Sequence, residues 1–303
     1  MNEDIRRRVL EGIAHNRTPG FHFAGNFLGI EIPEVGARTR VVMEPGAHCV
    51  EANGEAHVAA VFMVADIALA SCIRARLDPS QRLATVSMHL QMNGAPLAGT
   101  LEAIGDFAGF AAGGVAKQGL SRVTIRAGGV EAGFGHGAFM ALEPPPGLAM
   151  FPLQPTRIQA IALPDASSFS DTEREILRRA DAALAPGEGS FISRFFGIAP
   201  RKTAAGASCE LQNGLHVGNR VGHAQGGILM GLAARTASVA VGPGWTLASI
   251  TAAFVSPGEG GSLEATASVI HRGRWTAAAR TEVIVPGGRR VLEVVTTHAR
   301  LKE

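Results

Sequence analysis

Residues 56–72 read AHVAAVFMVADIALASC, and residues 224–240 read AQGGILMGLAARTASVA. Both stretches are apolar, and each contains one charged residue, Asp66 in the first and Arg235 in the second. Runs of this length are longer than typical strands, so we predict that each stretch forms one long buried helix. Neither stretch provides the roughly 18 uninterrupted apolar residues of a membrane span.

The two stretches are copies of one pattern, separated by 168 positions (224 minus 56). The same offset relates FLGI at 27–30 to FFGI at 195–198, and a slightly smaller one relates Leu83-Ala84 to Leu247-Ala248. A period this long indicates a duplicated domain, since solenoid repeats recur every 20 to 50 residues or so. Two similar domains in one chain usually pack as a pseudo-symmetric dimer.

Composition favours an ordinary globular protein. The chain has 303 residues, which suits two domains of about 150 residues each. A net charge of +2, without a basic run, gives no support for a nucleic-acid partner. The first 16 residues lack the features of a signal peptide and predict an amphipathic helix. The three cysteines, Cys49, Cys72 and Cys209, have neither paired nor metal-like spacing, so we predict a reducing, cytoplasmic location.

Each half is predicted to carry a meander of strands after its long apolar helix. Turn signals such as Asn93-Gly94, Gly113-Gly114 and Pro257-Gly258 separate the segments. The predicted strands are 82–92, 98–107, 110–117 and 121–130 in the first half, and 246–256, 262–271, 275–285 and 289–300 in the second.

A proline-rich stretch, residues 144–169, is predicted to link the two halves, which span residues 1–143 and 170–303. The second half opens on Ser170-Asp-Thr-Glu173, which has the pattern of a capping box. We therefore predict a helix from this point to about residue 183, matching the N-terminal helix of the first half.

Asp66 is the first candidate functional residue. Its neighbours three and four positions away are apolar, so its carboxylate needs partners or a raised pKa. Perturbed carboxylates of this kind concentrate at functional sites. The alternative is an aspartate that faces solvent on a half-exposed helix.

Gln225-Gly226-Gly227, at the start of the second apolar helix, is the next candidate. Glycines there leave backbone N–H groups open at the positive end of the helix dipole, where they suit a developing oxyanion. The alternative is that the glycines only allow close packing. Asp66 lies nine residues beyond His57, the counterpart of Gln225, and hence about 13 Å along its helix. The carboxylate of one repeat must therefore meet the glycine turn of the other.

These residues resemble a known family, the tandem hotdog-fold acyl-CoA thioesterases, close to the phenylacetate-pathway (PaaI-like) group. The family motif is an asparagine, then His-Gly-Gly, then an aspartate nine residues after the histidine. The resemblance implies an α+β fold with two hotdog domains. Each would be an antiparallel sheet wrapped around a long central helix, and the two would pack as a pseudo-dimer.

The family motif is divided between the repeats of this chain. The first repeat keeps His57 and Asp66 but has Val58-Ala59 in place of the glycines and Glu51 in place of the asparagine. The second repeat keeps the asparagine and the glycines, but has glutamine for the histidine and alanine for the aspartate; the residues are Asn219, Gln225, Gly226, Gly227 and Ala234. The resemblance thus implies one complete site and one degenerate site.

The implied activity is hydrolysis of an acyl-CoA thioester, without a metal or other cofactor. Gly226 would bind the thioester oxygen, and Asn219 would orient the carbonyl group or water. Asp66 would act as a general base or as a nucleophile, and the sequence leaves both roles open. Arg272 and Arg274 would bind the phosphates of coenzyme A. A homodimer of such chains is also expected.

Two other functions remain open from the sequence. A hotdog enoyl-CoA hydratase or dehydratase would need a histidine and an acid facing one pocket, whereas His57 and Asp66 are about 13 Å apart. A non-catalytic acyl-CoA binding protein is the other alternative. His48, His216 and His223 are expected to have structural roles.

Overall fold

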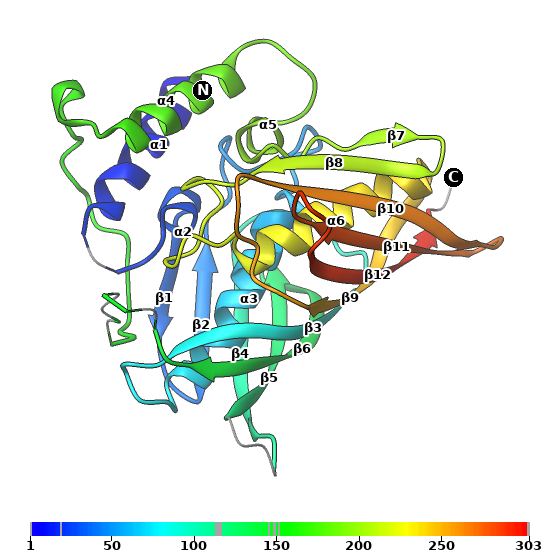
Figure 1. The fold of residues 1–303 in the computed structure, drawn as a ribbon, viewed down its shortest axis with the longest axis horizontal. Helices are drawn as coiled ribbons and strands as arrows, with labels where there is room; N and C mark the ends of the chain where they lie inside the picture. The colour runs from blue at the N-terminus through cyan, green and yellow to red at the C-terminus, as the bar shows by residue number, and fades with distance from the viewer. Residues whose placement is uncertain are drawn as a thin grey trace.

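One antiparallel sheet and two central helices dominate the molecule (Figure 1). The structure is a computed structural model, and it describes residues 2–18, 20–112, 117–144, 146–147, 150 and 152–301. The elements, in chain order, are α1 Asn2–Asn16, α2 Phe23–Leu28, β1 Ile30–Glu34, β2 Arg38–Met43, α3 Val58–Arg74, β3 Arg82–Met92, β4 Leu101–Phe110, β5 Gln118–Ala127, β6 Val130–Leu142, the 3-10 turn η1 Ala166–Ser168, α4 Asp171–Leu184, α5 Phe191–Phe196, β7 Arg201–Thr203, β8 Gly206–Gln212, α6 Gly226–Val241, β9 Trp245–Phe254, β10 Ser262–Arg272, β11 Thr276–Ile284 and β12 Arg290–Arg300.

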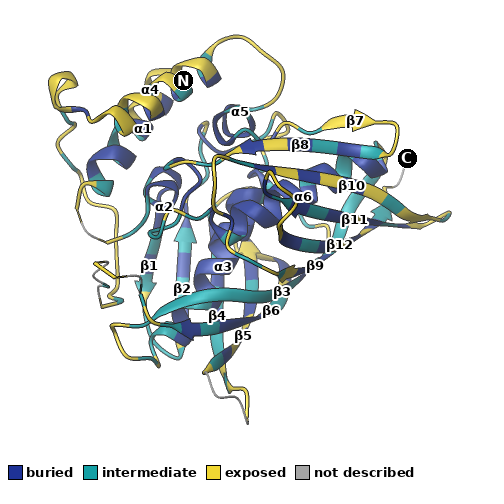
Figure 2. Ribbon diagram, in the orientation of Figure 1, coloured by how far each residue is buried: buried dark blue, intermediate teal, exposed yellow. Residues whose placement is uncertain are grey.

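The two predicted apolar helices are confirmed as α3 and α6. Each begins after a residue whose side chain accepts a backbone hydrogen bond of the first turn, His57 for α3 and Gln225 for α6. Such caps satisfy donors that a helix leaves unpaired. Because both helices are apolar on nearly all sides, they lie inside the molecule, as Figure 2 shows. No helix among the described residues is long and apolar enough to cross a membrane.

The predicted strands of the second half are confirmed to within two residues at each end, as β9 to β12. In the first half β3 matches its prediction, and β4 lies three residues further along than predicted. The prediction of strands at 110–117 and 121–130 was wrong, because the chain forms β5 at Gln118–Ala127 and β6 at Val130–Leu142. The predicted break at Gly113-Gly114 lies outside the described residues.

Glycines explain why β6 was missed. The segment contains Gly133, Gly135 and Gly137, and glycine has a low preference for strands. Here the glycines allow β6 to approach β3: a Cβ atom at Gly133 would lie 2.5 Å from the carbonyl oxygen of Gln91, and one at Gly135 would lie 2.0 Å from that of His89. Close packing of two backbones therefore overrides local propensity.

Within the described residues the sheet has 12 strands in the order β1-β2-β4-β5-β6-β3-β9-β12-β11-β10-β8-β7. Strands β1 to β6 occupy one part of the sheet and β7 to β12 the other, in mirrored order. The two parts meet at β3 and β9, which pair in antiparallel fashion from Ser87 opposite Ala253 to Gln91 opposite Ser249.

Helices α2 and α5 carry the short repeated sequence and pack against each other. Each ends at a glycine in the left-handed conformation, Gly29 with φ 76° and Gly197 with φ 78°. Glycine adopts this conformation without steric cost. The rings of Phe27 and Phe195, which occupy the same position of the repeat, lie 4.9 Å apart in the core.

The predicted N-terminal helix and the predicted capping box are both confirmed. Ser170 accepts from the backbone N–H of Glu173, whose side chain accepts from the backbone of Ser170. The helix it begins, α4, lies beside α1 (Figure 1), and Arg17 binds Glu173 at 2.7 Å between them. Between β6 and α4 the described part of the proline-rich segment is mostly irregular, with a bridge from Thr156 to Ile32.

Candidate active site

Asp66 lies in the middle of α3 and is buried, with only 6% of its surface exposed. Its surroundings on the helix are the apolar core, as the sequence predicts. Burial raises the pKa of Asp66 to about 7, although hydrogen bonds from Gly227, Gln225 and Thr85 partly oppose this rise. The carboxyl group therefore changes its charge close to neutral pH.

Gln225 connects this carboxyl group to the start of α6. Its Oε1 atom accepts from the backbone N–H of Ile228 at 3.0 Å, which caps the helix. Its Nε2 atom donates to Oδ2 of Asp66 at 2.5 Å. Because one amide is bound at both ends, its orientation is fixed, and so is the position of the carboxylate on it.

The two glycines of the turn have different tasks. A Cβ atom on Gly227 would lie 2.5 Å from the backbone nitrogen of Met63, so this glycine allows α6 to cross α3 closely. A Cβ atom on Gly226 would lie 3.0 Å from Oδ2 of Asp66, so this glycine makes room for the carboxylate.

The backbone N–H groups of these glycines differ in the same way. The backbone of Gly227 hydrogen-bonds to Asp66. The N–H of Gly226 makes no hydrogen bond with any residue that the structure describes. It is therefore an open donor at the positive end of α6, beside a carboxylate.

Thr85 is a site residue that the sequence did not reveal. Its Oγ1 atom lies 3.5 Å from Oδ1 of Asp66. Thr85 stands at an irregularity in the pairing of β3 with β6, between Thr85 and Ser87, and such bulges redirect side chains. Its counterpart in the second repeat, Ser249, also carries a hydroxyl group, which was the one available signal.

Asn219 lies in the loop before α6 and shapes that loop. Its Oδ1 atom accepts from the backbone N–H groups of Val221 at 3.0 Å and His223 at 3.1 Å. Its side-chain nitrogen has no hydrogen-bond partner within the described part of the chain. Asn219 is thus near the start of α6, but the structure gives it no direct contact with Asp66.

Arg272 and Arg274 are not brought to this cluster. Arg272 donates to the carbonyl oxygen of Val241, at the C-terminal end of α6. That end is about 22 Å along the helix from Gly226. The Arg272 guanidinium therefore stabilises the negative end of the helix dipole. Arg274 stacks on the exposed ring of Trp275, with its guanidinium carbon 4.7 Å from the ring centre.

Other basic side chains lie near the loop before α6. His223 lies 3.6 Å from Glu259, which also binds Arg289 at 3.2 Å. Burial, together with the charges of Arg82 and Arg289, lowers the pKa of His223, while Glu259 opposes the shift. In the described part of the chain no three His, Cys, Asp or Glu side chains are grouped to hold a metal ion.

The sequence repeat relates the Asp66 cluster to a second position, at the start of α3. The residues at that second position are different. The residue equivalent to Asp66 is Ala234, which is buried and brings no carboxylate. His57 caps α3 there by accepting from the backbone N–H of Ala59 at 3.1 Å. The Nε2 atom of His57 lies 3.6 Å from Oε1 of Glu51, so its ring is turned toward Glu51 and away from Asp66.

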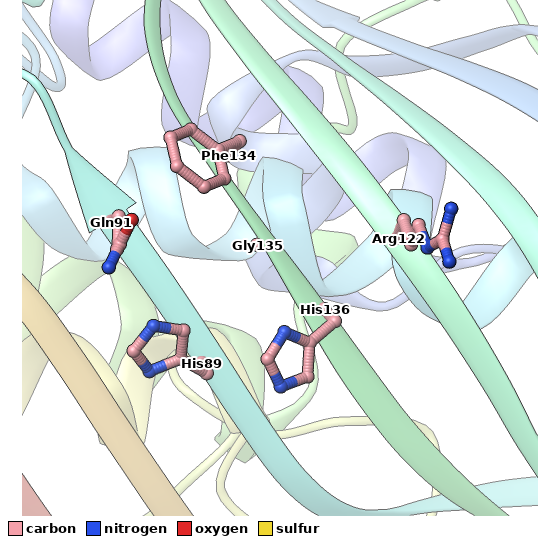
Figure 3. Close-up of a pocket in the computed structure, with 6 residues that line it drawn as sticks. All are labelled: His89, Gln91, Arg122, Phe134, Gly135 and His136. Carbon is pink, nitrogen blue, oxygen red and sulfur yellow. The ribbon is translucent and has the colours of Figure 1, made fainter.

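A cavity also opens on the face of the sheet opposite α3 (Figure 3). Met88 and Leu90 of β3 point into the core, so the alternate residues of this strand point to the other face. The cavity is lined by His89, Gln91, Arg122, Phe134, Gly135 and His136. None of the predicted site residues contributes to it, so this surface is separate from the Asp66 cluster.

Comparison with known proteins gives an independent result for the second half. Residues 217–300 match the family model of the acyl-CoA thioesterase N-terminal domain. This part of the chain is similar to an acyl-CoA thioesterase domain. The matched residues include Asn219, Gln225, Gly226 and Gly227. No curated protein matches the sequence.

Solved structures similar over most of the chain include a thioesterase. The 12:0-ACP thioesterase from Umbellularia californica has a TM-score of 0.54 at 11% identity, covering 86% of this chain and 94% of that one. The tesB protein of Mycobacterium avium subspecies paratuberculosis has a TM-score of 0.52 at 13% identity, covering 91% and 96%. A conserved protein with a hot dog fold from Alicyclobacillus acidocaldarius has a TM-score of 0.51 at 10% identity, covering 87% and 94%.

At these identities the likeness establishes the fold, which is the hotdog fold. The match of residues 217–300 to an acyl-CoA thioesterase domain supports a thioesterase enzyme.

Proposed function

We propose that the protein hydrolyses an acyl-CoA thioester to a free acid and coenzyme A, at one composite site built from both repeats. The observation that carries the proposal is the 2.5 Å hydrogen bond from Gln225, at the start of α6, to Asp66 in α3. It joins a carboxyl group with a pKa of about 7 to an open helix N-terminus.

The reaction needs a donor for the thioester oxygen and an activated nucleophile. The N–H of Gly226 donates to the carbonyl oxygen, which becomes negative as the tetrahedral intermediate forms. Ionised Asp66 either removes a proton from the attacking water or attacks the carbonyl carbon itself, with water then cleaving the anhydride. In either route the C–S bond breaks when the tetrahedral intermediate collapses, and the thiolate of coenzyme A leaves; in the second route this step forms the anhydride. The thiolate takes up the proton that the attacking water gave up.

The neighbouring side chains position these groups. Gln225 and Thr85 hold the carboxylate, and the hydroxyl of Thr85 would also bind the attacking water. The free side-chain nitrogen of Asn219 would orient the carbonyl group of the substrate. The steps use only these protein groups and water, so the proposal includes no metal or other cofactor.

The finer assignments belong to the same proposal. The chain would be a PaaI-like double hotdog with domains 1–143 and 170–303 and a linker at 144–169. The mirrored strand order and the contact of Phe27 with Phe195 favour a pseudo-dimer of two repeats. Three cysteines without disulfide bonds suit a cytoplasmic enzyme. The homodimer of complete chains stays a prediction. Light scattering tests it by measuring the mass of the particle in solution.

The test is thioester cleavage, followed by release of the free thiol, with acyl-CoA substrates of short, medium, long and aromatic chains. Asp66→Asn should lower kcat/KM by about 10² to 10⁴-fold, the usual contribution of a general base. Asp106→Asn is the matched control, since it removes a half-exposed carboxylate paired with Arg38, outside the Asp66 cluster. If Asp66→Asn retained half of the activity, the single-site proposal would be wrong.

Binding without cleavage is the alternative that this assay separates. If no acyl-CoA is hydrolysed and one binds tightly, the chain is an acyl-CoA binding protein. Two observations favour cleavage over binding alone. The second half is similar to an acyl-CoA thioesterase domain, and the Asp66 cluster brings a base and an oxyanion donor together. Hydrolysis is therefore the function that we favour.

A further inference from the structure

The hairpin between β10 and β11 forms one exposed end of the molecule. It reads HRGRW at residues 271–275, and it projects beyond the rest of the sheet (Figure 1). Neighbouring segments are bound to it or to each other. The backbone N–H of Arg300 donates to the carbonyl oxygen of Trp275 at 3.0 Å, and that of Leu301 donates to Gly244 at 2.9 Å. We call this region the hairpin end, and it consists of residues 202–206, 239–245, 269–276 and 299–301.

Positive charge collects at the hairpin end. None of its four segments contains an aspartate or a glutamate, and its basic side chains are Lys202, Arg272, Arg274 and Arg300. The whole chain has a net charge of only +2, so the remainder of the chain is net acidic. The charge is therefore polarised toward one end, and a field of this kind attracts an anionic surface.

Two of these basic side chains fix the hairpin end to a buried helix. Lys202 donates to the carbonyl oxygens of Val239 and Ala240, and Arg272 donates to that of Val241. These carbonyl groups belong to the C-terminal end of α6, which carries only about half a negative unit charge. Most of the positive charge thus stays uncompensated, on a part of the molecule that is anchored to the core.

Large apolar side chains are exposed among these charges. Trp275 is 65% exposed, Ile270 is 58% exposed and Leu301 is 50% exposed. Figure 2 shows the tip of the hairpin as exposed. The second tryptophan, Trp245, lies in the same end, where the guanidinium carbon of Arg300 is 5.4 Å from its ring centre. Exposed apolar side chains that gather at one place mark a surface for binding another molecule or a membrane.

A lipid bilayer with anionic headgroups fits both features. Lysine and arginine are attracted to the negative surface of such a bilayer, and tryptophan rings favour the boundary between headgroups and acyl chains. Ile270 and Leu301 gain free energy by leaving water for that boundary. A nucleic acid would satisfy the charges, but its phosphate backbone would not bury the aliphatic side chains.

We propose that the hairpin end binds the surface of a membrane that contains anionic phospholipids, with Trp275 and Ile270 at the level of the headgroups. Charge brings the protein to the surface, and the apolar side chains hold it there. The Asp66 cluster lies at the opposite end of α6, about 22 Å along the helix, so binding leaves it uncovered. The inference does not depend on which thioester the protein cleaves.

The chain supplies its own probe for this proposal. Its two tryptophans are both in the hairpin end, and it contains no tyrosine, so intrinsic fluorescence reports on this end. The full-length protein is mixed with vesicles of equal parts phosphatidylcholine and phosphatidylserine, and separately with vesicles of phosphatidylcholine alone. We expect sedimentation with the mixed vesicles only, together with a shift of tryptophan emission to shorter wavelength. Added salt should release the protein, because it screens the charges.

Two variants separate the contributions of charge and apolar contact. Arg274→Gln should weaken binding to the mixed vesicles about fivefold, the effect of one basic residue at an anionic surface. Ile270→Ser should weaken it about tenfold, since it removes an apolar anchor.

Matched substitutions elsewhere serve as controls. Arg178→Gln removes an exposed arginine of α4, which lies away from the hairpin in Figure 1. Val130→Ser removes an aliphatic side chain of β6 that is 62% exposed. Neither control should change vesicle binding, and thermal melting of each variant checks the fold.

Several results would overturn the inference. They are no sedimentation with the mixed vesicles, sedimentation without a change in tryptophan emission, and binding that Arg274→Gln and Ile270→Ser leave unchanged. A DNA duplex that binds as tightly as the vesicles, and loses affinity in Arg274→Gln but not in Ile270→Ser, would assign the hairpin end to nucleic acid instead. Failure of the proposed function is recognised separately, as absent thioester cleavage.

Discussion

At the scale of single residues, Asp66 is buried at a position where its neighbours counteract part of the cost of burial. Desolvation raises its pKa, and the three hydrogen bonds from Gly227, Gln225 and Thr85 lower it again, to about 7. A base with a pKa near neutrality is ionised often enough to act and still accepts a proton readily. The balance between these effects has measurable consequences.

The first consequence is the pH dependence of catalysis. Both roles proposed for Asp66 require the ionised form, so kcat/KM should rise with pH through a midpoint near 7. Thr85→Val removes a hydrogen bond that favours the ionised form, and the midpoint should therefore move to higher pH. A pH–rate profile of both proteins measures the shift. An unchanged midpoint would exclude Thr85 as a partner of the catalytic carboxylate.

The second consequence is the pH dependence of stability. The pKa of Asp66 is about 7 in the folded state and near its ordinary value of 3.8 when unfolded. The folded state therefore binds the proton more tightly, and the stability gained from it, complete below pH 3.8, is lost as pH rises through 7. The loss amounts to at most about 4 kcal/mol, by the usual conversion.

Asp66→Asn avoids this loss, because the amide stays neutral. The variant should be more stable than the wild type at pH 8, with the difference shrinking toward pH 4. Urea unfolding at the two pH values measures it. If the variant were less stable than the wild type at pH 8, the prediction would be wrong. The hydrogen bonds to the ionised carboxylate would then fully offset the cost of burying its charge.

At the scale of elements, the crossing of α3 and α6 depends on the absence of side chains. Gly227 lies against the backbone of Met63, and Gly231 lies against Ala59, where a Cβ atom would be only 2.4 Å from the Cβ of Ala59. These contacts are between rigid backbones, so a methyl group cannot be accommodated by a rotamer change. The same crossing brings the start of α6 to Asp66.

Substitution of the two turn glycines should separate folding from catalysis. Gly227→Ala should destabilise the protein by about 3 kcal/mol or more, since it forces the helices apart. Gly226→Ala should leave the fold intact but lower kcat/KM at least about tenfold, since its Cβ atom would displace the carboxylate. Gly261→Ala, with nothing within 4 Å of the new methyl group, is the control. Equal loss of stability in both turn variants would contradict this distinction.

At the scale of the whole molecule, the candidate site exists only where the two parts of the sheet meet. Strands β3 and β9 pair directly, and α3 packs on α6, so the sheet and the central helices are both continuous across the two parts. Neither repeat contains the carboxylate, its amide partner and the open N–H together. We therefore expect the two parts to stay together without a covalent link.

Cleavage of the linker tests this expectation. A protease site introduced between Ile158 and Leu163 lies beyond the bridge of Thr156 to Ile32, so cutting there should break no strand pairing. The two fragments should elute together in size-exclusion chromatography and keep thioesterase activity. Each fragment, separated in denaturant and refolded alone, should be inactive. Activity in either fragment alone would refute a site shared between repeats.

The sequence by itself determined what depends on pattern. The lengths and apolar character of α3 and α6, the capping box at Ser170 and the strands of the second half follow from periodicity and local chemistry. Asp66 could be singled out because a charge within an apolar helix is costly wherever that helix lies. The geometric need for a partner from the other repeat followed from the rise of a helix.

The tertiary structure decided everything that depends on which backbone lies beside which. The sequence did not predict β6 because its glycines disfavour a strand locally. They are needed for close contact with β3, which local strand preference does not take into account. Thr85 joins Asp66 through the registry of a strand against a helix. Arg272 is occupied at the far end of α6, and His57 turns to Glu51 instead of Asp66. These pairings depend on contacts between residues distant in the chain, which a sequence pattern specifies only indirectly.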